Sequence, residues 1–220
     1  DHRDLHRVDR RQRQMCIRDR SYTNKKWVGP SEQNLEKSLR FSKNLSISQL
    51  SAYQLIKNKI AEKDYLEYVS PRIKNLVPNP KIFLHMEKGS LRLLKAIKKK
   101  EKVAIFADYD VDGTVSAALI SLWLRNASIE PTVYIPDRET EGFGPNIEAM
   151  NKLALNHSLI ICVDCGTDSE EAIRGATERG VDVIVIDHHK SDTFSKSAYA
   201  IINPNRFDEK NIFPYLCAAG

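Results

Sequence analysis

Three groups of acidic and imidazole side chains stand directly after short apolar runs of the sequence. They are Asp108, Asp110 and Asp112, then Asp164, and finally Asp187-His188-His189. Carboxylates and imidazoles gathered at one place would repel one another and titrate abnormally unless a cation lay among them. These residue types therefore predict a site for a pair of divalent metal ions.

The spacing of the first group indicates how its carboxylates could share one site. Alternate residues of an extended segment face the same way, so Asp108, Asp110 and Asp112 are expected to point into one crevice. Gly113 allows a sharp turn into a following helix, whose N-terminus favours an anionic phosphate. The first group therefore predicts both metal ligands and a place for phosphate.

The other two groups complete this hypothesis. Asp164 stands at a separate strand end, where its carboxylate would bridge two metals. Asp187 and one of the two following histidines would add ligands, and the other histidine would contact a phosphate oxygen. Two metals roughly 3.5–4 Å apart activate water and stabilise the charge of an in-line phosphoryl displacement. The alternative is that the histidines only cap a strand-end loop, and the two further acidic strand ends weigh against it.

The elements that must position these groups alternate regularly along the chain. Apolar runs predict strands over residues 103–107, 132–135, 159–163, 181–186 and 200–202, with helices over 114–126, 146–156 and 169–179 between them. This order predicts an α/β fold, a parallel sheet with helices on both faces and right-handed crossovers. The carboxyl ends of parallel strands line one crevice, so the three groups are expected to meet at one edge of the sheet.

The segment before this domain is polar and helical in pattern. We expect a small helical lobe and linker over residues 22–80, ended by Pro71, Pro78 and Pro80, and the main domain over residues 81–220. Ser48 is expected to cap a helix of the lobe. The apolar stripe of that helix would contain Leu50, Tyr53, Ile56 and Ile60.

A further helix is expected over residues 90–100, at the start of the main domain. Its apolar residues Leu91, Leu94 and Ile97 would face inward. Lys95 and the lysines at 98–100 would face outward, and cations are favourable at a helix C-terminus. A solvated helix end explains these lysines better than a nucleic-acid patch does.

Composition limits the other classes of function. Residues 1–21 hold seven Arg and four Asp, so much of the net charge of +5 lies there. The stretch Met15 to Arg20 resembles translated sequencing adaptor, and we expect a non-native or disordered leader rather than a basic nucleic-acid-binding arm. No apolar stretch approaches the ~18 residues of a membrane span. Cys162 and Cys165 lack a second pair to form a zinc site, and free thiols without an export signal favour a reducing cytoplasm.

The first acidic group also resembles parts of two other known motifs, a calcium-binding loop and a phosphatase nucleophile motif. Residues 108–113 match the start of an EF-hand calcium loop, but Leu119 stands where a ligating Glu is needed and a strand precedes the loop. Asp110-Val-Asp112-Gly-Thr114 resembles the nucleophile motif of haloacid-dehalogenase phosphatases, in which Asp110 would be phosphorylated. The imidazoles of the third group suit manganese better than the magnesium that this chemistry uses.

Taken together, the three groups resemble the first three motifs of the DHH phosphoesterase superfamily. The matching segments are Asp108–Thr114, Val163–Gly166 and Asp187–His189. Two further segments, Ile135–Gly144 and Ile202–Asn205, narrow the resemblance to its RecJ-type exonucleases, which degrade single-stranded DNA from 5′ to 3′. The resemblance covers about residues 77–220.

The resemblance implies a metal-dependent exodeoxyribonuclease of DNA recombination and repair, with Mn²⁺ or Mg²⁺ in a two-metal site. It implies single-stranded DNA as substrate, and a single-strand-binding protein and a recombination helicase as protein partners. The implied metal ligands are Asp108, Asp110, Asp112, Asp164, Asp187 and His188. The implied catalytic residues are Asp110, Asp112, Asp164, His188 and His189. His189, Arg138 and Lys190 would bind substrate phosphates, with a surface salt bridge as the alternative for Arg138 and for Lys190.

The sequence also departs from the family pattern. Some DHH enzymes have a histidine where this chain has Phe106, and the family continues to a fourth motif with another metal-binding Asp and then to further domains. We therefore expect an N-terminal fragment, truncated at its C-terminus, with little or no nuclease activity alone. Two alternatives stay open: a DHH phosphodiesterase for small oligonucleotides or cyclic dinucleotides, and a non-catalytic relative that binds single strands.

Overall fold

The computed structural model describes residues 22–26, 28–210 and 213–220, so the expected leader over residues 1–21 lies outside them. The chain divides into two compact units, one ending at Val77 and one running from Pro78 to Gly220. Helix η2 (Pro80–Ile82), a short 3-10 turn, packs on helix α6 (Met86–Lys99). For that reason the second unit begins slightly before the boundary expected after residue 80.

The first unit is helical. Helix α2 (Glu32–Leu45) packs on α3 (Gln49–Lys57), and Ser48 caps α3 by accepting a hydrogen bond from the backbone N–H of Ser51, as expected. The expected stripe is wrong at Leu50, which is 70% exposed, whereas its other members, Tyr53, Ile56 and Ile60, are half-buried. The fully buried residues of α3 are Ala52 and Leu55. The orientation of α3 against α2 determines which face of α3 is buried. Gln49 Nε2 of α3 donates to the hydroxyl of buried Ser38 in α2 at 3.2 Å. The remaining elements of the unit are η1 (Glu62–Asp64), α4 (Tyr65–Val69) and α5 (Ile73–Leu76).

The second unit is built on a five-stranded sheet with strand order β2-β1-β3-β4-β5, and every pairing is parallel. Its strands are β1 (Val103–Ala107), β2 (Thr132–Tyr134), β3 (Leu159–Val163), β4 (Asp182–Ile186) and β5 (Ala200–Ile202). The three strands that precede the acidic groups, β1, β3 and β4, are direct neighbours. The α/β prediction is confirmed.

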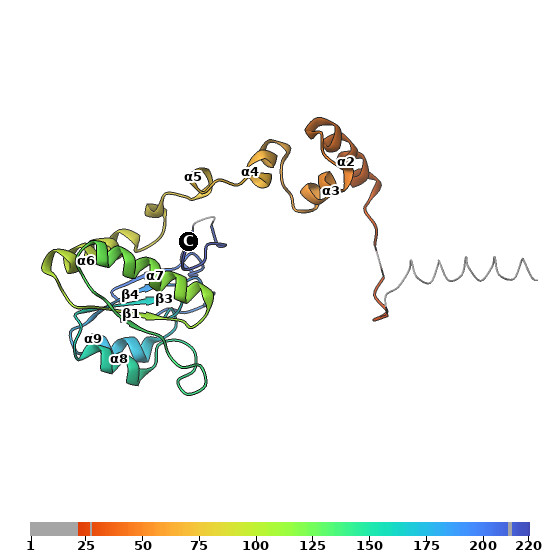
Figure 1. Ribbon diagram of the computed structural model, residues 1–220. Helices are drawn as coiled ribbons and strands as arrows, with labels where there is room; N and C mark the ends of the chain where they lie inside the picture. Colours follow the sequence, from red (N-terminus) through yellow and green to blue (C-terminus); the bar gives the residue numbers. More distant parts are fainter. Residues whose placement is uncertain (1–21, 27, 211–212) are drawn as a thin grey trace, which may run out of the picture. The chain divides into compact units, whose positions relative to one another are not determined.

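Helices cover both faces of this sheet, as Figure 1 shows. Alternate residues of a strand point to opposite faces. Ala104 and Phe106 of β1 lie in a core with α8 (Ile147–Ala154) and α9 (Glu170–Thr177). The other residues of β1 lie in a second core on the side of α6 and α7 (Val111–Asn126).

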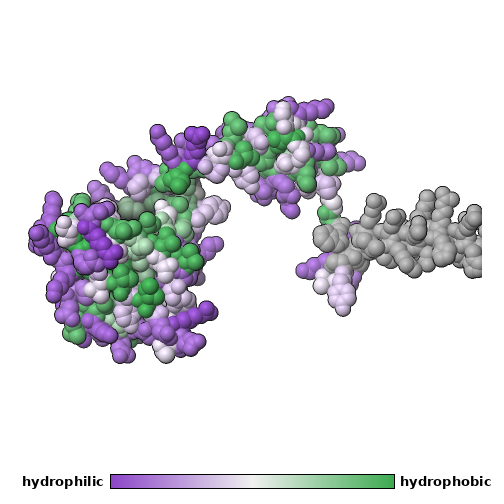
Figure 2. Space-filling model, viewed as in Figure 1, coloured by the Kyte–Doolittle hydropathy of each residue, from purple (hydrophilic) through white to green (hydrophobic). Residues whose placement is uncertain are grey.

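Helix α7 turns its small residues toward the sheet. Its buried residues are Gly113, Ser116, Ala117, Ser121 and Leu124. Larger apolar residues stay outside, with Leu119 at 52% and Leu122 at 59% exposure, and Figure 2 shows apolar residues gathered on the viewed face of this unit. Small side chains let the backbone of α7 approach β1, which places the first acidic group close to the sheet edge.

Helix α6 differs from its prediction. Leu91 and Leu94 are exposed, whereas Ile97 is partly buried and packs against the core, as expected. The buried residues of the helix are Gly89, Arg92 and Ala96. Buried Arg92 pairs with Glu101 at 2.7 Å and with Asp182, and these ion pairs turn the helix. Among the described helices, none has both the length and the apolar character that crossing a membrane requires.

Candidate metal centre

Backbone pairing that continues past the strands fixes three acidic residues side by side. The N–H of Asp108 donates to the Val163 carbonyl at 3.2 Å, and the N–H of Asp164 donates to the Ile186 carbonyl at 2.8 Å. The N–H of Asp187 donates to the carbonyl of β5 residue 202 at 3.0 Å. The sheet therefore determines these positions before any side chain interacts. Asp164 adopts a left-handed φ of 60° there.

The first group is not extended throughout, which corrects the sequence-based expectation. Asp110 is the N-cap of α7, its Oδ1 accepting from the Gly113 N–H at 2.9 Å, and Asp112 lies in the first helical turn. Gly113 is required for close approach rather than for a turn, because a Cβ there would lie 2.4 Å from the Asp108 carbonyl oxygen. A carboxylate is favourable at the N-terminus of a helix, where it accepts hydrogen bonds from free backbone N–H groups. The hydrogen bond from Gly113 accordingly lowers the pKa of Asp110.

Asp108, Asp110 and Asp164 form the first set of candidate ligands. Each offers a carboxylate oxygen, and these oxygens lie within 4.8 Å of one another. Burial raises the pKa of Asp108, and burial with the neighbouring Asp110 and Asp112 raises the pKa of Asp164 to about 8. Oδ1 of Asp108 and Oδ1 of Asp164 are buried and accept no hydrogen bond. Buried carboxylate oxygens without donors fit a bound cation, and carboxylates are ligands for Mg²⁺ and Mn²⁺.

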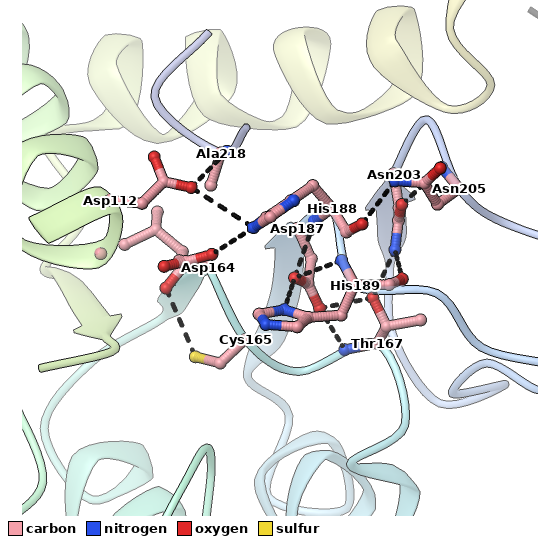
Figure 3. Close-up of polar contacts among 12 residues, drawn as sticks. Asp112, Asp164, Cys165, Thr167, Asp187, His188, His189, Asn203, Asn205 and Ala218 are labelled. Atoms are coloured by element: carbon pink, nitrogen blue, oxygen red, sulfur yellow. Dashed lines mark hydrogen bonds and ion pairs between the residues drawn. The ribbon is translucent and has the colours of Figure 1, made fainter. Parts of the chain in front are cut away.

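Asp164, His188 and His189 form the second set, with ligand atoms again within 4.8 Å of one another. Nε2 of His188 lies 3.2 Å from Asp164 Oδ1 and 3.5 Å from Asp112 Oδ2, as Figure 3 shows. The Asp112 carboxylate accepts hydrogen bonds from the N–H groups of Ala218 and Ala219. Desolvation opposes ionisation of Asp112, but these backbone donors hold its pKa below the usual value. Because Asp164 belongs to both sets, the two sets share one carboxylate.

Asp187 lies outside both sets. Its carboxylate accepts hydrogen bonds from the N–H and hydroxyl of Thr167, from the N–H groups of His188 and His189, and from Nδ1 of His189 at 2.7 Å. Desolvation by burial would raise the pKa of Asp187, but the hydrogen bonds from the Thr167 hydroxyl and the His189 ring outweigh it and lower the pKa. This environment suits a carboxylate that orients the His189 ring.

Three polar residues with no role assigned from the sequence hold the histidine segment. Asn203 Nδ2 donates to Thr167 Oγ1 and to the His189 carbonyl, both at 2.9 Å. Asn205 Nδ2 donates to the His188 carbonyl at 2.6 Å. The motif at residues 202–205 was visible in the sequence, but a turn of asparagines and proline does not reveal its hydrogen-bond partners.

The expected phosphate-binding cations lie outside the two ligand sets. The Arg138 guanidinium lies over the Tyr109 ring, 5.6 Å from its centroid, and pairs with no carboxylate of the described residues. Lys190 directly follows His189 and is exposed. Phe143, in the same loop as Arg138, contacts the edge of the His189 ring at a centroid distance of 5.4 Å. Positive φ angles at Gly142 and Gly144 shape this loop.

Comparison with known proteins identifies the second unit. Residues 102–220 match the DHH family, N-terminal domain. The chain belongs to the DHH family. The matched range contains all three acidic groups, whereas the calcium-loop and haloacid-dehalogenase interpretations concerned only the first.

Similar DHH proteins include "Single-stranded-DNA-specific exonuclease RecJ" of Bacillus subtilis (strain 168), 37% identical over 122 residues. That match covers 55% of this chain but 16% of the relative. The RecJ protein of Escherichia coli (strain K12) is 34% identical over 125 residues, covering 56% of this chain and 22% of the relative.

Solved structures agree with the DHH assignment. A crystal structure of exonuclease RecJ bound to manganese has 27% identity and a TM-score of 0.54, covering 61% of this chain and 34% of that one. RecJ from Thermus thermophilus in complex with Mn²⁺ has the same fold, with 22% identity, a TM-score of 0.61, and coverage of 84% and 25%. The chain thus spans a minor part of the proteins that it matches.

Proposed function

We propose that the chain carries the metal centre of a single-strand-specific DNA exonuclease that hydrolyses phosphodiester bonds from the 5′ end. The observation that carries this proposal is a pair of buried oxygens, Oδ1 of Asp108 and Oδ1 of Asp164, which accept no hydrogen bond. Asp164 belongs to both ligand sets, and Nε2 of His188, from the second set, lies 3.2 Å from its Oδ1. The names of the RecJ relatives support single-stranded DNA as the substrate. Recombination and repair, with a single-strand-binding protein and a helicase as partners, form the proposed setting.

The two ligand sets suggest how Mn²⁺ or Mg²⁺ would be held. Asp108, Asp110 and Asp164 would hold one ion, and Asp164 and His188 would hold the other with Asp112 beside them. Bound divalent ions would activate a water molecule and offset the charge of the transition state. The imidazole ligand favours Mn²⁺ over Mg²⁺.

The remaining residues of the site act on geometry and on the substrate. Asp187 is proposed as a positioning residue, since Thr167 and the histidine segment already occupy its oxygens. It holds Nδ1 of His189, whose ring is partly exposed and would present Nε2 to a phosphate oxygen. Arg138 and Lys190 would contact the scissile or a neighbouring phosphate, where cations offset the charge of the strand.

A hybrid protein tests this function. Residues 102–220 would replace the matching segment of the B. subtilis relative, and the hybrid would be assayed with Mn²⁺ on single and double strands labelled at either end. We expect release of nucleotides from the 5′ end of single strands. Asp164→Asn in the hybrid should lower the rate by more than ~100-fold, because it removes a group that supports transition-state charge.

The matched control is Asp192→Asn, an exposed carboxylate outside both ligand sets, which should leave the rate unchanged. Equal rates for the hybrid and its Asp164→Asn variant would contradict the proposal. Cleavage of cyclic dinucleotides or dinucleotides without digestion of long strands would favour the small-substrate phosphodiesterase. Strand binding without cleavage would favour a non-catalytic role.

A further inference from the structure

The last residues of the chain bind the side chain of Asp112. The N–H of Ala218 donates to Asp112 Oδ2 at 2.8 Å, and the N–H of Ala219 donates to Asp112 Oδ1 at 2.9 Å. Figure 3 shows contacts from the Asp112 carboxylate to both Ala218 and His188. Because consecutive N–H groups reach different oxygens, they fix the plane of the carboxylate as well as its position.

The segment that supplies these donors, Pro214–Gly220, is itself anchored. Leu216 packs against the core formed by β1 and α7. Asn205 Nδ2 donates both to the Pro214 carbonyl at 3.1 Å and to the His188 carbonyl at 2.6 Å. The segment is therefore tied to the backbone of His188 on one side and to the side chain of Asp112 on the other.

These contacts leave Asp112 able to bind a cation. Each carboxylate oxygen has two lone pairs, so the carboxylate has about four acceptor sites. The two backbone N–H groups and the Cys217 side chain, which also hydrogen-bonds Asp112, leave an acceptor site free. On Oδ2 that site lies toward His188 Nε2, 3.5 Å away. Without the two donors, the side chain of Asp112 in the first turn of α7 would exchange among rotamers.

We propose that Pro214–Gly220 is a positioning element of the metal centre, which aims Asp112 at His188 through the backbone N–H groups of residues 218 and 219. This inference rests on the proposed function, since it gives Asp112 the role of a ligand beside the second set. The two N–H donors are main-chain groups, and the Cys217 side chain adds a hydrogen bond to the same carboxylate.

Proline and glycine variants separate the N–H groups from the rest of the segment. Ala218→Pro and Ala219→Pro each remove one donor, and Ala218→Gly and Ala219→Gly keep it as matched controls. We expect the proline variants to shift the His188 ring resonances in NMR spectra of the metal-free chain, and the glycine variants to leave them unchanged. Mn²⁺ affinity measured by EPR should fall about tenfold per lost donor, as for a hydrogen bond to a charged group.

A second NMR comparison does not depend on the proline variants folding. Asp112→Asn should shift the amide resonances of Ala218 and Ala219, while core resonances of β1 and β3 stay in place. Unchanged amide resonances would overturn the proposal, as would a folded proline variant that keeps the His188 resonances. Failure of the unsubstituted chain to bind Mn²⁺ would instead count against the proposed function, and the NMR comparisons would still decide the positioning.

Discussion

Two buried aspartates of this site have different roles because their surroundings differ, although the residue type is the same. Asp164 and Asp187 are 1% and 3% exposed and end neighbouring strands. Asp187 is surrounded by N–H and O–H donors, which lower its pKa. Oδ1 of Asp164 accepts no hydrogen bond and has the His188 imidazole beside it at 3.2 Å, and burial raises the pKa of Asp164 to about 8. The first carboxylate is satisfied by the protein, and the second is left for a cation. Sequence alone assigned both the same role because donors become visible only in the fold.

Gly113 offers a test of the close approach between α7 and β1. A Cβ at this position would meet the Asp108 backbone, with the carbonyl oxygen at 2.4 Å, so Gly113→Ala must displace the helix start. We expect a loss of about 1–3 kcal/mol in the free energy of unfolding, as for other overpacked sites. Urea denaturation measures it.

The control is Gly29→Ala, since no atom lies within 4 Å of a Cβ built there. Its effect should stay within about 0.5 kcal/mol. Equal stabilities of the two variants would show that α7 can shift at no cost and that Gly113 is not needed for the geometry of Asp108.

At the scale of elements, the sequence predicted the strands well and the helix faces less well. Continuous apolar runs mark buried parallel strands, and β1, β3 and β5 have the predicted bounds. Helix α7 begins earlier than expected because Asp110 caps it. Helix α6 exposes Leu91 and Leu94 and buries Arg92, which pairs with Glu101 and Asp182 beyond its own helix. Ion pairs between distant segments are not encoded in local periodicity.

The loop that follows the histidine segment is held by the first residue of α9. The Glu170 carboxylate accepts from the Ser195 hydroxyl at 2.7 Å, from the Lys196 N–H at 2.8 Å and from the Ser197 hydroxyl at 2.7 Å. Hydrogen bonds from these serines lower the pKa of Glu170 from 4.5 to about 2. The carboxylate therefore stabilises the folded chain only in its ionised form.

This shift predicts a pH-dependent stability. Because folding lowers the pKa of Glu170, its carboxylate stabilises the folded state at pH values above the ordinary pKa of 4.5. This stabilisation is lost as the pH falls toward about 2. We expect Glu170→Gln to be less stable than the unsubstituted chain at pH 7, with the difference shrinking as the pH falls below 4.5. Urea denaturation at pH 7 and at acidic pH measures it. Glu171→Gln, an exposed neighbour, is the control, and a difference that does not vary with pH would refute the loop assignment.

At the scale of the whole molecule, residues 102–220 match the DHH family, while the chain covers 16% and 22% of two curated RecJ relatives. The sequence could locate the ligands of the metal centre because they follow three strands of one sheet. The sequence could not reveal that the backbone N–H groups of Ala218 and Ala219 donate to the Asp112 carboxylate, because nearly every residue type has a backbone N–H.

We predict that the 220-residue chain alone digests single strands far more slowly than the hybrid described above. Contacts that grip a strand contribute ~1–3 kcal/mol per stacked base, and the relatives have most of their length outside the matched segment. The same labelled strands and Mn²⁺ concentrations compare the two proteins. Digestion by the chain at the rate of the hybrid would show that these 220 residues suffice for the activity.

The backbone of Asp164 has an implication for engineering. Its left-handed φ of 60° costs roughly 1–2 kcal/mol for a residue with a side chain, and glycine would remove that cost. A library sorted for heat resistance without added metal would therefore enrich glycine at this position and discard the carboxylate that both ligand sets share. Thermal stability and cation binding therefore favour different residues at this position, so variants should be selected with the metal ion present.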